Sequence, residues 1–146
     1  MMESRVSLIT LGVADLDRAA DFYQNVIGWP VAARPGDVVF FDLNGLILAL
    51  FGHAALGQDM NVAAVLPVTP YRGMTLAHNV DSREAVDAVF ARLATAGIVP
   101  LKAPEPVFWG GYSGYFADPD GHVWEIAHNP FWTILEDGRI SMQSPD

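Results

Sequence analysis

Residues 8–20 read LITLGVADLDRAA, and residues 75–87 read TLAHNVDSREAVD. Each stretch begins with an apolar run typical of a β-strand and continues into apolar side chains at helical spacing. Asp15 is suited to cap the first helix, and Asp81 or Ser82 the second, because short polar side chains accept from the free N–H groups of a first turn. The two matching starts indicate one structural unit used twice in the chain.

Each predicted helix ends near a glycine and is followed by three predicted strands. A short extended stretch comes first, around Val31 in one unit and Val99 in the other. Two strands then flank a tight turn, at 38–43 and 46–51 around Asn44-Gly45, and at 112–117 and 122–127 around the sequence DPDG. The unit is therefore strand, helix and three strands.

We expect a single domain over residues 1–146, with the two units at about 6–52 and 74–130. The linker, 53–73, shows no clear period and contains two prolines, so it is predicted to be a loop or an irregular crossover. In the tail, 131–146, Phe131 and Trp132 are expected to pack against the domain.

The composition narrows the possible functions. The 146 residues include no cysteine, which excludes disulfides, thiolate metal sites and a cysteine nucleophile. A net charge of -9 disfavours nucleic acid and anionic membranes as partners. It reflects either a solvated surface or attraction for a cationic ligand. No secretory signal and no membrane-spanning run are recognisable, so we expect a cytoplasmic protein.

The repeat, together with VADLDRAADFYQNVIGW at 13–29 and FADPDGHVWEI at 116–126, resembles the vicinal oxygen chelate superfamily. That superfamily contains glyoxalases, bleomycin resistance proteins and extradiol dioxygenases. The resemblance implies an α+β fold in which two tandem βαβββ units form an eight-stranded, curled mixed sheet around a cavity, with the helices outside. It also implies a homodimer.

Enzymes of this superfamily hold a divalent metal with side chains from the first and last strands of each unit. Glu125 matches one such position, whereas Leu8, Ala49 and Thr75 occupy the others and lack the expected ligands. A single carboxylate holds a divalent ion poorly. We therefore expect no usual metal site and no cofactor. The alternative is one divalent metal ion held by Glu125 with a rearranged set of histidines or waters.

The histidines are assigned mainly structural or surface roles. His78, His122 and His128 have the parity opposite to Thr75 or Glu125 on their strands, so regular strands would direct them away from the cavity. His53 lies beyond its strand and remains open as a ligand.

Glu125 is the candidate catalytic residue, as a general base, although a carboxylate with no role in a reaction is an equal interpretation. The segment 107–116 combines aromatic residues with paired glycines, which suits either a ligand site or a core or dimer interface. Strand parity adds further positions on the cavity face. The ligand-binding candidates are Thr10, Phe51, Thr75, Trp109, Tyr112 and Tyr115.

We expect a small-molecule-binding protein that holds a cationic or aromatic organic ligand, in the manner of the bleomycin resistance proteins. The alternative is a divalent-metal-dependent enzyme, either a glyoxalase-like lyase or isomerase or a dioxygenase, that uses Glu125. No phosphate-binding loop, dinucleotide fingerprint or serine elbow is present in the sequence.

Overall fold

The computed structural model describes residues 1–143 and divides the chain after Pro70 into two compact units. The division falls within the predicted linker. The last three positions of the predicted tail, 144–146, lie outside the described part of the chain. No helix among the described residues is long and apolar enough to cross a membrane.

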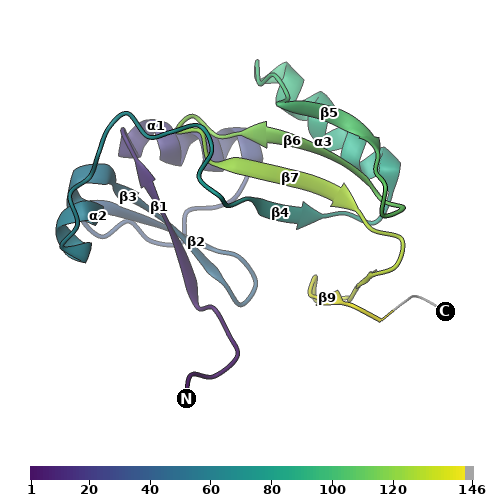
Figure 1. The fold of residues 1–146 in the computed structure, drawn as a ribbon, viewed down its shortest axis with the longest axis horizontal. Coiled ribbons are helices and arrows are strands. Elements are labelled where there is room, and N and C mark those ends of the chain that lie inside the picture. Colours follow the sequence, from purple (N-terminus) through teal and green to yellow (C-terminus); the bar gives the residue numbers. More distant parts are fainter. Residues whose placement is uncertain (144–146) are drawn as a thin grey trace. The chain divides into compact units, whose positions relative to one another are not determined.

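The first unit contains one sheet and a helical segment that continues from α-helix into a π-helical turn, η1 (Figure 1). The sheet has the order β1-β3-β2, with β1 parallel and β2 antiparallel to β3. The elements are β1 (Leu8–Val13), α1 (Leu16–Asp21), η1 (Phe22–Ile27), β2 (Val38–Asp42), β3 (Ile47–Gly52) and α2 (His53–Met60).

The predicted helix signals of the first unit are confirmed. Asp15 Oδ1 accepts from the backbone N–H of Arg18 at 3.0 Å, and Gly28 ends the segment at a φ of 93°. Tyr23 is fully buried and stacks on Trp29, with ring centroids 6.0 Å apart. Alternate residues of the strands complete this core: Leu11, Val13, Val39, Phe41, Leu48 and Leu50.

Two expectations for the first unit are wrong. The strand predicted around Val31 is replaced by a single bridge between Ala33 and Phe40, so this sheet has three strands. The predicted irregular linker begins with the helix α2. Its Gly57 is buried, and a Cβ there would lie 2.7 Å from the carbonyl oxygen of Val62. The helical structure of α2 thus depends on close backbone packing, which leaves no periodic signal in the sequence.

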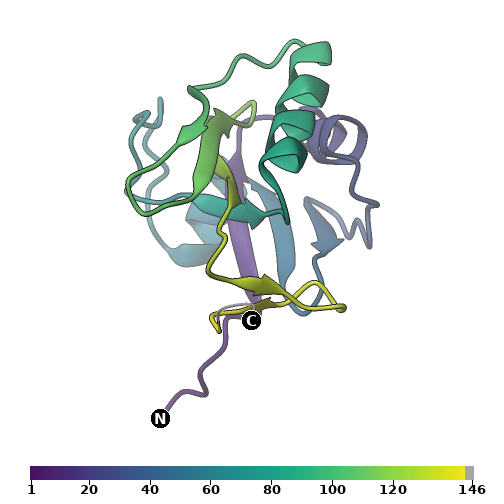
Figure 2. The same cartoon turned by 90° about the vertical axis from the view of Figure 1, so that its right-hand side faces the viewer.

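The second unit has a four-stranded sheet with the order β4-β7-β6-β5, in which β4 runs parallel to β7 and the other pairs are antiparallel. Figure 2 shows the tail hairpin that follows β7. The elements are β4 (Leu76–Asn79), α3 (Arg83–Thr95), β5 (Lys102–Pro106), β6 (Tyr112–Ala117), β7 (Val123–His128), β8 (Thr133–Ile134) and β9 (Ile140–Ser141).

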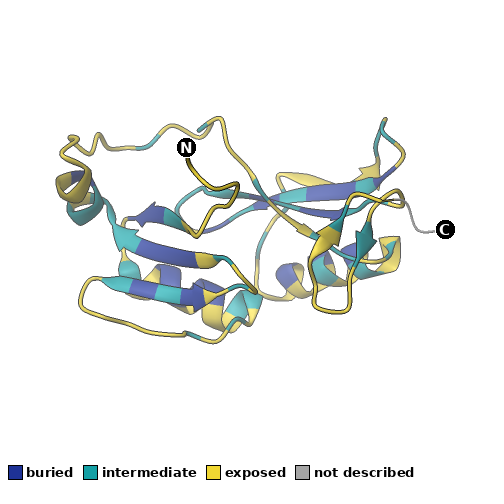
Figure 3. Cartoon of the chain, turned by 90° about the horizontal axis from the view of Figure 1, so that it is seen from below, coloured by how far each residue is buried: buried dark blue, intermediate teal, exposed yellow. Residues whose placement is uncertain are grey.

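Helix α3 covers one face of this sheet. Ser82, rather than Asp81, caps it by accepting from the backbone N–H of Ala85 at 3.0 Å. Phe90 meets Phe116 edge to face, with ring centroids 6.3 Å apart. Buried stretches of this unit are dark blue in Figure 3, and those on the side of α3 include Val86, Phe90, Leu93, Phe116, Trp124 and Ile126. We call the other side of the sheet the helix-free face.

The third predicted strand of this unit begins at Lys102, later than the expected stretch around Val99. In the tail, Phe131 is 54% exposed and Trp132 is 38% exposed, so the expected packing covers more of the tryptophan than of the phenylalanine. The tail forms its own hairpin, and the edge of the Phe131 ring lies near Gly110.

The α+β class and the repeated unit are confirmed. Among the described residues, hydrogen bonding groups the strands into sheets of three, four and two. The eighth strand of the expected set is the isolated bridge of the first unit, and the hairpin β8–β9 was not expected.

Gly114 in β6 provides a test of the packing of α3 and β5. A Cβ at this position would lie 2.8 Å from the Phe90 ring and 2.9 Å from both the Lys102 carbonyl oxygen and the Pro104 nitrogen. Because backbone cannot yield cheaply, Gly114→Ala is expected to lower the free energy of unfolding by about 1–3 kcal/mol. Urea denaturation followed by tryptophan fluorescence measures this change.

Gly52→Ala is the matched control. Gly52 has an ordinary φ of -57°, and no atom lies within 4 Å of its added Cβ. Its free energy of unfolding is expected to change by no more than about 0.5 kcal/mol. Equal losses in the two variants would contradict the packing described for Gly114.

Candidate functional site

Glu125 and Tyr115 form a hydrogen-bonded pair on the second sheet. They lie directly opposite each other on β7 and β6, and the Tyr115 hydroxyl donates to Glu125 Oε2 at 2.5 Å. Their chain neighbours Trp124 and Phe116 are buried on the side that α3 covers. Because successive side chains of a strand alternate between faces, Glu125 and Tyr115 both belong to the helix-free face. Both are half-buried.

The electrostatics of this pair keep the phenolic proton on Tyr115. The hydrogen bond to Glu125, followed by burial and the negative charge of the carboxylate, raises the pKa of Tyr115 to about 12. The phenol therefore remains protonated at neutral pH and acts as a donor. Glu125 is consequently held in one orientation, and its lone pairs beyond the one used by Tyr115 are available to a further donor.

Further polar side chains share the helix-free face. Strand register places Ala77, Glu125, Tyr115 and Lys102 in one row across the sheet. The Lys102 ammonium lies 3.0 Å from the carboxylate of Glu105. A second row on the same face contains Glu105 of β5, which pairs with the buried Ser113 of β6.

Sequence reasoning missed Lys102, Glu105 and Ser113 as neighbours of the pair. The available signal was the parity that Ser113 shares with Tyr115. Lys102 and Glu105 of β5 gave no such signal. A register irregularity separates them, and side-chain alternation does not continue across such an irregularity.

Tyr112 and Trp109 do not join the pair. Tyr112 lies on the side of α3, where its hydroxyl donates to Asp87 Oδ1 at 2.7 Å and the Arg83 guanidinium lies 5.4 Å from its ring centroid. Trp109, in the turn before β6, covers Gly111 so closely that a Cβ there would clash with the indole ring. These contacts fit a structural role for the aromatic segment, the alternative to a ligand site.

Three other candidates occupy different positions. Thr75 is exposed and directly precedes β4, so it is not part of the strand that was expected to contain it. In the first unit, Thr10 pairs with Ala49, and Phe51 lies two residues farther along β3. Both are half-buried, on the face opposite the buried Leu11 and Leu50. The structure thus groups Thr10 with Phe51, and Tyr115 with Glu125.

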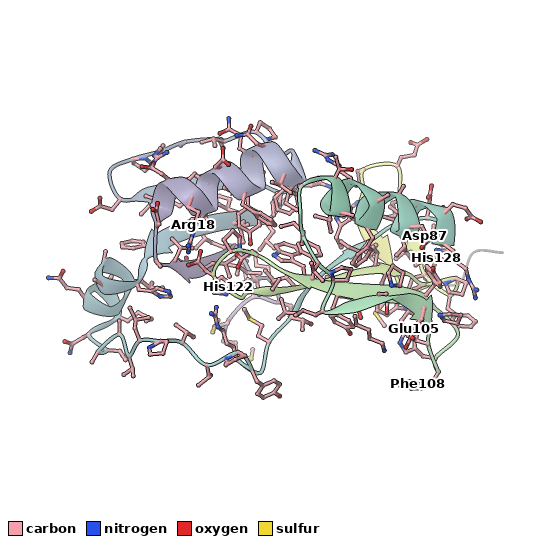
Figure 4. The ribbon with its side chains drawn as sticks, turned by 90° about the horizontal axis from the view of Figure 1, so that it is seen from above. Arg18, Asp87, Glu105, Phe108, His122 and His128 are labelled. Carbon is pink, nitrogen blue, oxygen red and sulfur yellow. The ribbon has the colours of Figure 1, made fainter. Side chains whose placement is uncertain are left out.

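His128 lies at the end of β7, where it pairs with Tyr112 on the side of α3 (Figure 4). His122 lies at the other end of β7, where its Nδ1 is 2.7 Å from Arg72 Nη1. Arg72 also donates to the carbonyl oxygen of Asp120, and so stabilises the turn that leads into β7.

The donor set does not fit the superfamily's metal site. Within residues 1–143, no three histidine or acidic side chains gather into a group that could hold a metal ion. Glu125 has a tyrosine hydroxyl and an alanine as its cross-strand neighbours, and neutral phenols and methyl groups are not usual ligands of divalent ions. Absence of the usual metal site stays a prediction for the protein in solution.

The fold and the site together define a class: an α+β protein built from two related units, with a carboxylate on the last strand of the second. A family model, Glyoxalase/Bleomycin resistance protein/Dioxygenase superfamily, matches residues 5–126. The chain belongs to this superfamily.

Solved structures and curated proteins agree with this membership. A glyoxalase-related enzyme from Fulvimarina pelagi is 39% identical, with a TM-score of 0.86 over 97% of this chain and 100% of that one. Lactoylglutathione lyase from Agrobacterium tumefaciens is 25% identical, with a TM-score of 0.67 over 87% and 95%. Metallothiol transferase FosB from Lysinibacillus sphaericus is 28% identical over 86% of this chain and 83% of its own.

The hydrogen bond between Tyr115 and Glu125 predicts a measurable change in the titration of Tyr115. Glu125→Gln removes the charge that holds the phenolic proton, so the pKa of Tyr115 is expected to fall from about 12 toward its ordinary value of about 10. Tyrosine Cζ chemical shifts followed by NMR between pH 8 and pH 12 resolve this change.

Asp87→Asn is the control, because Asp87 accepts from Tyr112 in the same sheet and raises the pKa of that tyrosine. It should lower the pKa of Tyr112 and leave that of Tyr115 in place. A Tyr115 titration near pH 10 in the unmodified protein would show that the Glu125 bond is absent in solution.

Proposed function

We propose that the protein binds a small organic cation that contains an aromatic ring. The ligand would lie on the helix-free face of the second sheet, and its cationic group would donate a hydrogen bond to the Glu125 carboxylate. The hydrogen bond from Tyr115 to Glu125 carries this proposal. It holds a carboxylate that is half-buried, oriented and still able to accept further hydrogen bonds. An ammonium group next to this carboxylate would add a second hydrogen bond to the one that Tyr115 donates.

Charge and aromatic surface support a cationic ligand. The chain carries a net charge of -9, which raises the local concentration of cations. Tyr115 offers an aromatic ring next to the carboxylate, and a ring face attracts a cation independently of hydrogen bonding. The name of the superfamily includes bleomycin resistance proteins as well as enzymes, and we propose binding without turnover for this chain. We extend the proposal to a cytoplasmic homodimer.

A second candidate is a metal-dependent transferase or lyase, with Glu125 as one ligand. The similarity to metallothiol transferase FosB and to lactoylglutathione lyase favours it. The donor set opposes it, since no three histidine or acidic side chains of residues 1–143 gather into a group that could hold a metal ion. Binding of an organic cation is therefore the function that the geometry supports best.

Titration with benzylamine tests the proposal, and benzyl alcohol serves as the neutral probe of the same shape. Benzylamine is expected to bind more tightly than benzyl alcohol, and Glu125→Gln should weaken benzylamine binding about tenfold while leaving benzyl alcohol unchanged. A charge-assisted hydrogen bond accounts for a change of this size. Chemical shifts of Tyr115 and of the β7 amides report occupancy of this face.

Glu105→Gln is the matched control variant. It removes one negative charge from the same face, but Glu105 pairs with Lys102, so its loss should weaken benzylamine binding less than twofold. Equal weakening in the two variants would mean that only the net charge attracts the amine, and the proposed site would be rejected.

A further inference from the structure

A cavity lies at the end of the sheet of the second unit, away from the Glu125 pair. It measures about 250 Å³, is open to solvent on part of its surface and is lined by three segments: the end of β4 with the residues that lead into α3, the end of β7, and the tail hairpin β8–β9. Neither Glu125 nor Tyr115 lines it. Its volume lies just below the range of pockets for drug-sized ligands, so it suits a compact molecule.

The lining of this cavity includes residues with hydrogen-bond acceptors. His128 Nδ1 is 3.2 Å from the carbonyl oxygen of Val80. Because a carbonyl oxygen only accepts, this contact places the proton on Nδ1 and leaves Nε2 of the neutral ring as an acceptor. Asp81 adds a carboxylate to the same lining. Ser82, rather than Asp81, caps α3, so the helix start does not occupy the Asp81 carboxylate.

The apolar part of the lining comes from the tail. Trp132, Ile134 and Ile140 line the cavity, and β8 pairs Ile134 with Ile140 across the hairpin. Trp132 is 38% exposed and Ile140 is 42% exposed. The Asn129 side chain, which also lines the cavity, accepts from the backbone N–H of Phe131 at 2.9 Å and so fixes the start of the tail. Large apolar side chains held around a hollow are typical of a ligand site.

We propose that this cavity is a second binding site, for a compact primary amine on an apolar body. The ammonium group would donate to Asp81 and to Nε2 of His128, while the apolar body packs against Trp132 and the two isoleucines. Neither the function proposed for Glu125 nor its ligand is needed for this site, because the two share no lining residue.

The test is an NMR titration of the full chain with cyclohexylmethylamine, and cyclohexylmethanol as its neutral counterpart. The amine should shift the indole N–H resonance of Trp132 and the amides of Asn79 and Asn129, and the alcohol should do so at several-fold higher concentration. Asp81→Asn is expected to weaken amine binding about threefold to fivefold, as for a partly exposed ion pair. Trp132→Ala should weaken both probes about fivefold.

Two control variants show whether the amine recognises this cavity or only the negative charge of the chain. Glu84→Gln removes an equal charge from the first turn of α3 but does not line the cavity, so it should leave amine binding within twofold. The amine-induced shifts at Trp132 should be the same in Glu125→Gln, so failure of the Glu125 proposal does not decide this one. Equal weakening by Asp81→Asn and Glu84→Gln, or no shift of Trp132 with either probe, would overturn the proposal. Concentration-dependent shifts at Trp132 without any probe would also overturn it, because a second copy of the chain would then cover the cavity.

Discussion

The alternation of side chains along β7 is the constraint on which the second unit depends. β7 is the inner strand between β4 and β6, and its Trp124 and Ile126 are buried on the side that α3 covers. Glu125, between them, has to point to the other face. A register slip of one residue would bury the carboxylate under α3 and expose the tryptophan. The core packing of α3 and the placement of Glu125 opposite Tyr115 therefore arise from the same register.

The sequence allowed this register to be predicted because its signal is local: the DPDG turn sets the pairing of β6 with β7. The ends of the first helical segment were predictable for the same reason, since Asp15 and Gly28 mark them. The helix α2 and the hairpin β8–β9 were missed. Both depend on packing, as Gly57 against Val62 illustrates, and tertiary contacts of this kind leave no period in the sequence.

The candidate site was predictable in part for the same reason. Parity was sufficient to place Glu125 and Tyr115 on one face, but the hydrogen bond between them needed the register of two strands that are antiparallel. Tyr112 was a ligand-binding candidate by residue type alone, and its hydrogen bond to Asp87 of α3 needed the tertiary structure. Lys102 and Glu105 were out of reach because the strand that contains them is irregular.

We propose that Glu125 has a role different from the metal ligation that is usual in the superfamily. It accepts from a tyrosine of raised pKa, and within residues 1–143 no three histidine or acidic side chains form a group that could hold a metal ion. Elemental analysis of protein purified without a metal-binding tag, then dialysed against Mg, Mn, Fe, Co, Ni and Zn, tests this difference most directly. The account predicts well below one metal ion per chain, unchanged in Glu125→Gln. Near-stoichiometric retention of one metal that Glu125→Gln abolishes would contradict it.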